Sequence, residues 1–427
     1  MDQNMVVRKD SMWPWVICAA CVLVFFTSIG LTPGTFSAYA PFMIEEWGLT
    51  NVQNSTIVSI RTFMGTIAIF LCGVWFNKLF SLRVGLALGV LFGAIGFFLF
   101  AVAASSSNPY MIACIAAVCT GSCYGFAGSV PVSIIINNWF NKKRVTAMSI
   151  SFASSGIAAW IVPPIVSRLV VNTSLQTAFI AEGCVIAGIA IVAFLLLRNK
   201  PEDVGVEPLG GADFVEAQKE SKKKYIEIFH PTKTSQYLVY VVSFIIGAIN
   251  FTAYNHFVVL YTTDGGWDPV SASGFLSMAG FALLVGKLAG GWLADRYSAR
   301  STAIIFFGFT LAAMILAPAT CTVANPIIPK LVMLVYGIGG ILATTGISAY
   351  ALELSTKEDY AQVVRWAYVV YGISSAVCSY GMGFIADTTG GYSMAFYTLA
   401  VLTVVGFLIL QYAYRLAKPE RLKPTEL

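Results

Sequence analysis

The strongest constraint on this chain is a series of apolar runs, each long enough to cross a lipid bilayer. A transmembrane helix needs about 20 mostly apolar residues, because the hydrocarbon core is about 30 Å thick and each helical residue adds about 1.5 Å. We therefore predict an all-α integral membrane protein with twelve transmembrane helices. The runs lie near residues 12–32, 53–76, 84–104, 109–136, 145–168, 177–197, 236–261, 270–293, 301–321, 328–353, 362–385 and 391–414.

Composition supports membrane helices and argues against a soluble domain. Hydrophobic residues make up 57% of the sequence and charged residues only 11%, whereas soluble proteins carry about 25% charged residues. The runs are apolar on every face, whereas the strands of a membrane barrel alternate in polarity. Helices are therefore the predicted membrane elements.

One long charged loop divides the runs into two sets of six. Residues 198–235 are rich in Lys, Glu and Asp and include Lys222–Lys224. We predict an N-terminal six-helix bundle at 1–197, a cytoplasmic linker at 198–235 and a C-terminal six-helix bundle at 236–427. The linker is interpreted as solvated; a short helix on the inner membrane surface is the alternative.

The distribution of basic residues predicts the orientation. Arg8 and Lys9 precede the first run, which we interpret as an uncleaved span because it is longer than a signal-peptide core. Most of the 26 Lys and Arg residues fall in loops on the same side as the N-terminus, and cytoplasmic loops favour these residues. Both termini are therefore predicted to be cytoplasmic, in a multi-pass protein of the cell membrane. The opposite loops carry acids: Glu45, Glu46, Asp264, Asp268 and Asp387.

Several classes of function find little support in the sequence. The nine cysteines lie in apolar segments, and the two histidines, His230 and His256, cannot form a metal site by themselves. No basic cluster with interleaved aromatic residues suggests nucleic acid. A catalytic cluster is not evident, and the segments outside the runs are short for a signalling domain. We expect no metal or cofactor and no enzymatic activity.

Two loops carry related motifs. Gly73, Asn77 and Lys78 match Gly291, Asp295 and Arg296, and each pair is 218 positions apart. Two six-helix halves related by duplication are typical of transporters, whose binding site lies between the halves near the middle of the membrane. The repeat therefore favours a carrier.

The segment from Gly291 to Arg300 resembles the cytoplasmic loop motif of the major facilitator superfamily. This resemblance implies a conformational latch at Asp295, Arg296 and Arg300, with Arg144 as a partner of the acid, and it implies a monomer. The first copy departs from the motif because Asn77 replaces the acid. The alternative is that both loops are merely basic inner turns.

Two cations lie deep in predicted spans, without a carboxylate at matching depth in the sequence. Arg61 is near the middle of the second span, and Lys287 is two turns before Asp295 in the eighth. A charge at the bilayer centre costs at least about 2.5 kcal/mol, so it usually has a role in a cavity. Cations in such a cavity attract an anion. For Arg61 the alternative is a structural ion pair or a hydrogen bond to helix carbonyls.

Further segments resemble the monocarboxylate porters and the oxalate/formate antiporters: 30–36, 46–48, 138–140 and 287–295. The resemblance implies that Lys287 binds a substrate carboxylate. Leu283 stands where the porters have an aspartate for proton coupling, and Tyr371 stands where the antiporters have a second lysine. A monoanion is therefore expected more than a dianion, and Glu182, His256 or Lys287 would have to carry any coupled proton.

We predict a secondary active transporter of small organic anions, preferentially monocarboxylates, that works by alternating access. Coupling to protons as a symporter or to a second anion as an antiporter stays open. The alternative is a proton-driven exporter of drugs or metabolites, which requires a membrane acid such as Glu182. Polar and aromatic residues expected to complete the site, or else to pack or anchor helices, are Tyr124, Asn250, Tyr254, Asn255, His256, Tyr336 and Tyr371.

Overall fold

The computed structural model describes residues 12–72, 79–210, 226–296, 299–356, 358–417 and 420–422. Within these ranges the backbone alone is described at 145, 226–228, 287–296, 344–345, 361 and 420–422. The first copy of the loop motif, at 73–78, lies outside the described residues. So do the side chains of Lys287, Asp295 and Arg296.

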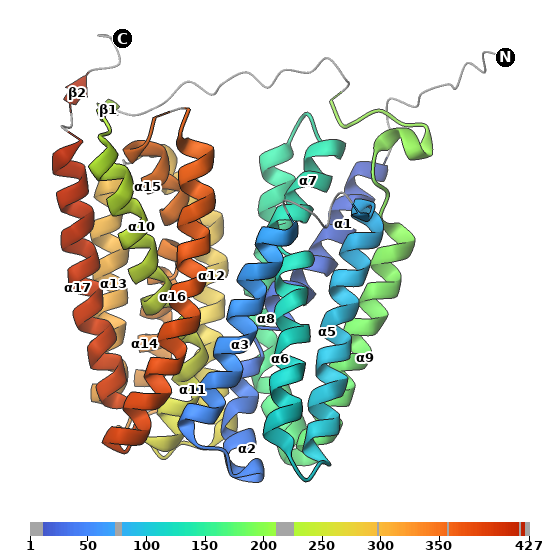
Figure 1. Cartoon of the computed structure of the whole chain (residues 1–427), viewed down its shortest axis with the longest axis vertical. Helices are drawn as coiled ribbons and strands as arrows, with labels where there is room; N and C mark the ends of the chain where they lie inside the picture. Colours follow the sequence, from blue (N-terminus) through green and yellow to red (C-terminus); the bar gives the residue numbers. More distant parts are fainter. Residues whose placement is uncertain are drawn as a thin grey trace. The chain divides into compact units, whose positions relative to one another are not determined.

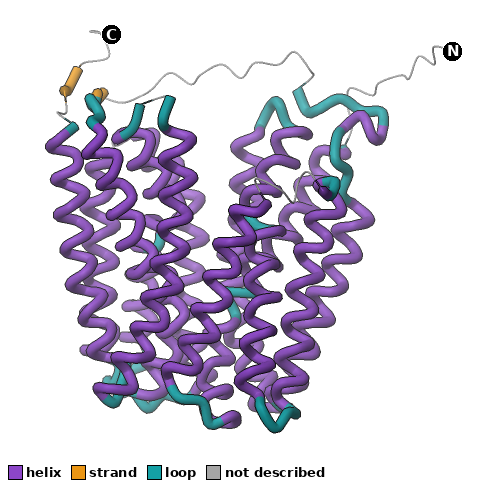
Figure 2. Tube along the Cα trace, in the orientation of Figure 1, coloured by secondary structure: helices purple, strands orange, loops and turns teal. Residues whose placement is uncertain are grey.

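The described chain is almost entirely helical (Figures 1 and 2). Its α-helices are α1 (Trp13–Phe25), α2 (Phe36–Trp47), α3 (Asn51–Leu71), α5 (Leu82–Ala104), α6 (Pro109–Phe126), α7 (Ser129–Trp139), α8 (Arg144–Asn172), α9 (Leu175–Leu196), α10 (Lys233–Gly247), α11 (Ala253–Thr263), α12 (Pro269–Arg296), α13 (Ala299–Thr320), α14 (Ile327–Gly339), α15 (Ile347–Leu354), α16 (Tyr360–Thr389) and α17 (Ser393–Leu416).

Shorter elements join or interrupt these helices. Three are π-helical turns and one is a 3₁₀ turn: η1 (Phe26–Leu31), η4 (Ala248–Thr252), η5 (Leu342–Gly346) and η3 (Pro201–Val204). Two three-residue strands, β1 (Ile226–Ile228) and β2 (Glu420–Leu422), pair in antiparallel fashion. They lie beyond the ends of α10 and α17 (Figure 1). The predicted all-α architecture thus gains one small strand pair outside the apolar runs.

Eleven helices in the described ranges are long and apolar enough to cross a membrane. The prediction of a multi-pass helical membrane protein is confirmed. The predicted span at 328–353 is not among the eleven. It is divided among α14, η5 and α15, and only Ile327–Gly339 stands out as a shorter apolar helix.

Interruptions recur at every third predicted span. The first contains η1 and a turn, the fourth breaks between α6 and α7, the seventh contains η4, and the tenth contains η5. The recurrence of a π-helical turn in the first and seventh spans agrees with the duplication seen in the loop motifs. Interrupted membrane helices often line substrate sites, because their unpaired backbone groups are tolerated only in protein or next to a water-filled cavity.

The first span is longer than its hydropathy suggested. The run was expected to end near residue 32, but the helical segment continues through a turn to Trp47. The turn requires glycine, because a Cβ on Gly34 would lie 2.2 Å from the carbonyl oxygen of Gly30. Pro33 and Gly34 therefore produce a break within the span, and α2 completes it.

The chain forms two compact units. The first unit comprises Met1–Thr35, Met64–Ala158 and Leu169–Lys219, and the second comprises Phe36–Phe63, Ala159–Arg168 and Glu220–Leu427. In the first unit α5 packs against α6 and α9. There Phe179 of α9 stacks on Phe100 of α5, with ring centroids 5.3 Å apart.

In the second unit α10 packs against α16, α12 against α14, and α13 against α17. Close helix approach depends on small residues: a Cβ on Gly247 would lie 2.3 Å from the carbonyl oxygen of Tyr371. Helix α2 packs against α11 in the same unit. The N-terminal half of α3 also belongs to this unit. Its Ser59 Oγ donates a hydrogen bond to the carbonyl of Ala376 on α16. This packing brings Arg61 next to the seventh span.

Candidate functional site

The guanidinium of Arg61 is the centre of the candidate site. Arg61 lies in the middle of α3, and only 2% of its surface is exposed. Its Nη2 donates a hydrogen bond to Asn255 Oδ1 over 2.6 Å, and its Cζ lies 4.4 Å from the ring centroid of Phe36. An amide oxygen and an aromatic face are neutral partners, so neither contact cancels the positive charge. All three residues belong to the second unit.

The amide of Asn255 is oriented by its own helix. Its Nδ2 donates to the carbonyl of Phe251 over 2.7 Å, so its oxygen faces Arg61. Asn255 lies in the first turn of α11, directly after the π-helical turn η4. A π-helical turn adds a residue to the helical repeat and often marks a functional site.

His256 extends the polar group along α11. Its Nδ1 lies 2.8 Å from the carbonyl oxygen of Thr252. A carbonyl oxygen can only accept a hydrogen bond, so Nδ1 is the donor and carries a proton. In the neutral ring Nε2 then accepts from Ser55 Oγ at 3.0 Å. The imidazole is fully buried, and its ring centroid is 5.5 Å from that of Tyr392. These bonds fix the imidazole ring beside α3.

Asn250 and Tyr336 form a second polar pair on the same interrupted span. The hydroxyl of Tyr336, on α14, donates to the carbonyl of Asn250 in η4. The Tyr336 ring also meets Phe257 edge to face, with centroids 4.6 Å apart. Tyr254, between the two polar groups in sequence, is half-buried. The site residues predicted on the seventh span therefore lie in its π-helical turn or in the first turn of α11 that follows.

Other predicted substrate-binding residues lie elsewhere. Tyr371 is on α16, with its ring 6.4 Å from that of Tyr368. Tyr124 is on α6 in the first unit, where its ring would lie 2.9 Å from a Cβ on Gly65. Lys287 is on α12, and its side chain lies outside the described residues.

The predicted latch is described only in part. Arg144 donates from Nε to the carbonyl of Phe140 over 3.0 Å, so its guanidinium is held by the turn that precedes α8. Arg300 donates from Nε to Gln411 Oε1 over 3.3 Å. The side chains of the other two predicted latch residues, Asp295 and Arg296, are not described.

Sequence reasoning missed two contributors to the site, Phe36 and Ser55. A signal for Ser55 existed: Ser55, Ser59 and Thr62 follow one another at helical spacing and form a polar stripe on one face of an apolar span. Such a stripe indicates the face that meets other helices. Phe36 had no comparable signal, because its position depends on the turn after Leu31 and on the packing of α2.

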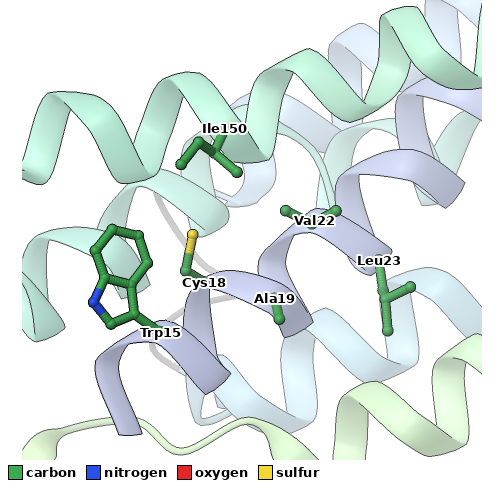
Figure 3. A pocket seen from close by; sticks show the side chains of 6 residues that line it. All are labelled: Trp15, Cys18, Ala19, Val22, Leu23 and Ile150. Atoms are coloured by element: carbon green, nitrogen blue, oxygen red, sulfur yellow. The ribbon is translucent and has the colours of Figure 1, made fainter. Parts of the chain in front are cut away.

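A separate apolar pocket of about 440 Å³ lies in the first unit (Figure 3). Figure 3 shows Cys18 and Ile150 pointing toward it from α1 and α8. Its lining residues carry no charge, which makes the pocket unsuitable as an anion site. They are Trp15, Cys18, Ala19, Val22, Leu23 and Ile150.

Apolar helices of membrane-spanning length, several of them interrupted, together with a buried arginine beside polar residues, are typical of a membrane transporter. Residues 16–379 match the family model of the Major Facilitator Superfamily, and the chain belongs to that superfamily. The members to which it is similar are transporters rather than enzymes, as the sequence predicted.

Curated relatives match nearly the whole chain. The chain is 23% identical to Monocarboxylate transporter 12 of Rattus norvegicus, across 98% of this chain and 88% of the relative. It is also 23% identical to Monocarboxylate transporter 13 of Rattus norvegicus, across 93% and 88%. The resemblance to monocarboxylate porters is thus confirmed.

Solved structures share the fold. A POT family transporter in complex with 5-aminolevulinic acid matches with a TM-score of 0.72 and 13% identity, over 97% of this chain and 99% of that one. A bacterial homolog of the human lysosomal transporter Spinster, in an inward-facing and unoccupied conformation, matches with a TM-score of 0.68 and 12% identity, over 96% and 98%.

Proposed function

We propose that this protein is a secondary active transporter of small organic anions, preferentially monocarboxylates. The observation that carries the proposal is the buried guanidinium of Arg61, which donates a hydrogen bond to Asn255 and lies against the ring of Phe36. In a low-dielectric site a fixed cation attracts an anionic group much more strongly than in water. The planar fork of arginine suits a carboxylate.

Two further facts support a monocarboxylate. The curated relatives above are named monocarboxylate transporters. The eleventh span carries Tyr371 where the related oxalate/formate antiporters place a second lysine, so one cation fewer is available for a dianion. In the proposed site Lys287 binds the carboxylate, and Arg61 supplements the positive field. Asn250, Tyr254, Asn255, His256 and Tyr336 complete it, with Tyr124 and Tyr371.

The proposed mechanism is alternating access between two six-helix bundles, 1–197 and 236–427, joined by a cytoplasmic linker at 198–235. The protein would lie in the cell membrane as a monomer, with both termini in the cytoplasm, as the basic loops predict. Asp295, Arg296, Arg300 and Arg144 would form the latch that holds one state. Interrupted spans give such a carrier places where a helix can bend.

Uptake of labelled monocarboxylates into proteoliposomes tests the site. We expect Arg61→Gln and Lys287→Gln each to weaken substrate affinity at least about tenfold, which corresponds to 1.4 kcal/mol of binding free energy. Arg365→Gln is the matched control, because Arg365 is an exposed arginine on α16. Unchanged affinity and uptake in the Lys287 variant would defeat its assignment as the carboxylate ligand.

A thermal-stability screen over carboxylates identifies the substrate class. A ligand that binds only the folded state raises its stability by RT ln(1 + [L]/Kd), about 2.7 kcal/mol at a hundredfold excess over Kd. We expect monocarboxylates to raise the melting temperature and dicarboxylates to raise it less. A screen in which cationic drugs raise it and carboxylates do not would favour the proton-driven exporter instead.

A further inference from the structure

Asn54 is a buried polar residue whose side chain has no hydrogen-bond partner in the described part of the chain. It lies in the first turn of α3, and none of its surface is exposed. Its amide oxygen and its amide nitrogen are both unpaired. Most other buried polar side chains are paired, as Thr35 Oγ1 is with Glu182 Oε1 at 2.7 Å. Unpaired buried polar groups are rare in folded proteins, because nothing repays their loss of water.

Tyr392, directly before α17, is a second group of this kind. The residue is fully buried, and its hydroxyl has no hydrogen-bond partner among the residues that the structure describes. The hydroxyl lies near the side chains of Asn54 and Ser55 but meets neither with the geometry of a hydrogen bond. Two unpaired buried groups from distant parts of the sequence therefore lie together, where the start of α3 meets the start of α17.

Ser55 adds an acceptor to this group. Its Oγ lies 3.0 Å from His256 Nε2, and the Nδ1 of the same ring donates to the carbonyl of Thr252. In the neutral ring Nε2 must accept, so the hydroxyl of Ser55 donates its one proton to the imidazole. A hydroxyl oxygen also has two lone pairs. Ser55 Oγ can therefore accept a hydrogen bond from a further donor.

The carboxylates near Tyr392 are already engaged. Asp387 accepts two backbone NH bonds at the N-terminus of α3, and Asp264 does the same at the N-terminus of α17. Neither carboxylate pairs with the hydroxyl of Tyr392 or with the amide of Asn54. The two caps hold both helix starts in place, so the unpaired groups lie in a fixed frame. Their partner has to be a molecule from outside the described chain.

We propose that Asn54, Ser55 and Tyr392 bind internal water, and that this water joins α3 to the start of α17. Water suits the set because it can donate to Asn54 Oδ1 and Ser55 Oγ and accept from the hydroxyl of Tyr392. A buried water typically makes about three such bonds. The three side chains are neutral, and a buried ion needs a charged partner. Asn54 precedes Arg61 by seven residues on the same face of α3, about 10 Å along the helix. The water bridge thus fixes the end of the helix that carries Arg61, whatever the substrate is.

Radiolytic labelling of the purified full-length protein in lipid tests the water site without any substrate. Hydroxyl radicals form from water itself, so a buried side chain is oxidised where water is bound beside it. Tyr414 is the matched control, because it is equally buried and its hydroxyl donates to Glu353. We expect several times more oxidation at Tyr392 than at Tyr414, and Asn54→Leu should remove the difference. Equal oxidation of the two tyrosines in the wild type overturns the water site, as does a difference that survives in Asn54→Leu.

A double-mutant cycle on the melting temperature tests the bridge. Asn54→Leu and Tyr392→Phe each remove one partner of the water and should each lower the melting temperature. Because the two side chains share the water, the double variant should lose less than the sum of the single losses. Asn54→Leu combined with Tyr397→Phe is the control pair, and its effects should add, since Tyr397 is exposed on α17. A higher melting temperature in Asn54→Leu would mean that the amide is dry and unpaired, which overturns the water site. Additive losses in the Asn54–Tyr392 pair overturn the bridge.

Discussion

The hydroxyl of Tyr336 donates a hydrogen bond to the main-chain carbonyl of Asn250, and this bond ties the tenth span to the π-helical turn of the seventh. Both residues are buried. Asn250 lies in the π-helical turn η4, whereas Tyr336 lies in the regular helix α14, shortly before the turn η5. The bond therefore joins two spans that are each interrupted.

Tyr336→Phe should lower stability and weaken substrate binding. The variant keeps the ring and its contact with Phe257 but leaves the buried carbonyl of Asn250 without this donor, which costs about 1–3 kcal/mol. Thermal unfolding in detergent measures the effect. Tyr397→Phe is the control, because Tyr397 is exposed on α17. Equal melting temperatures of the two variants would show that the bond contributes nothing.

Asn255→Asp should reduce anion binding. A carboxylate in place of the amide lies within hydrogen-bond distance of Arg61 and competes with a bound substrate for the same guanidinium. We expect at least about tenfold weaker monocarboxylate binding, measured by the ligand-induced shift in melting temperature. Asn325→Asp adds the same charge at an exposed position before α14 and should leave the shift unchanged. A normal shift in Asn255→Asp contradicts a role of Arg61 in binding.

Gly383→Ala should disturb the packing of α16 against α3. Its Cβ would lie 2.5 Å from Ser55 Oγ and 2.6 Å from the carbonyl oxygen of Asn51, and such overpacking costs about 1–3 kcal/mol. Gly381→Ala, two residues away on the same helix, meets no atom within 4 Å. It should be neutral or stabilising by up to about 1 kcal/mol, because alanine favours a helix over glycine. Melting temperatures in the reverse order would refute the close approach.

Asp264→Ala should weaken the start of α17. Asp264 Oδ1 accepts from the backbone NH of Tyr392, and Oδ2 accepts from the backbone NH and the hydroxyl of Ser393. Loss of such a cap costs about 0.5–2 kcal/mol. Hydrogen exchange at the first turn of α17 should rise in this variant and stay unchanged in Glu358→Gln, which alters an exposed acid. Unchanged exchange in both variants would argue against the cap.

Hydropathy could predict the membrane spans because it depends on residues that are adjacent in sequence. The first span shows its limit: the pattern stops near Pro33 and Gly34, whereas the helical segment resumes at Phe36 and runs to Trp47. The tenth run shows the opposite case: its apolar pattern continues from 328 to 353, whereas the structure divides it at η5. A local average does not register a turn of five residues within an apolar segment.

The candidate site shows a similar division. Sequence analysis identified Arg61 as a deep cation and named Asn250, Asn255 and His256 among the residues expected to complete the site. It could not pair Arg61 with Asn255, which is 194 positions away, nor place Phe36 over the guanidinium. Lys287 was assigned by resemblance, and its role stays a prediction.

By itself, the sequence determined the membrane class, the approximate spans and the presence of cations inside them. An apolar run is stabilised in the bilayer and a charge there is costly, and both effects depend on the residue type rather than on the tertiary contacts. Only the tertiary structure decided that Asn255 and Phe36 hold Arg61 and that Thr35 meets Glu182. Such contacts arise from helix packing and from breaks within spans, and packing joins residues whose separation in the sequence carries no record of their proximity.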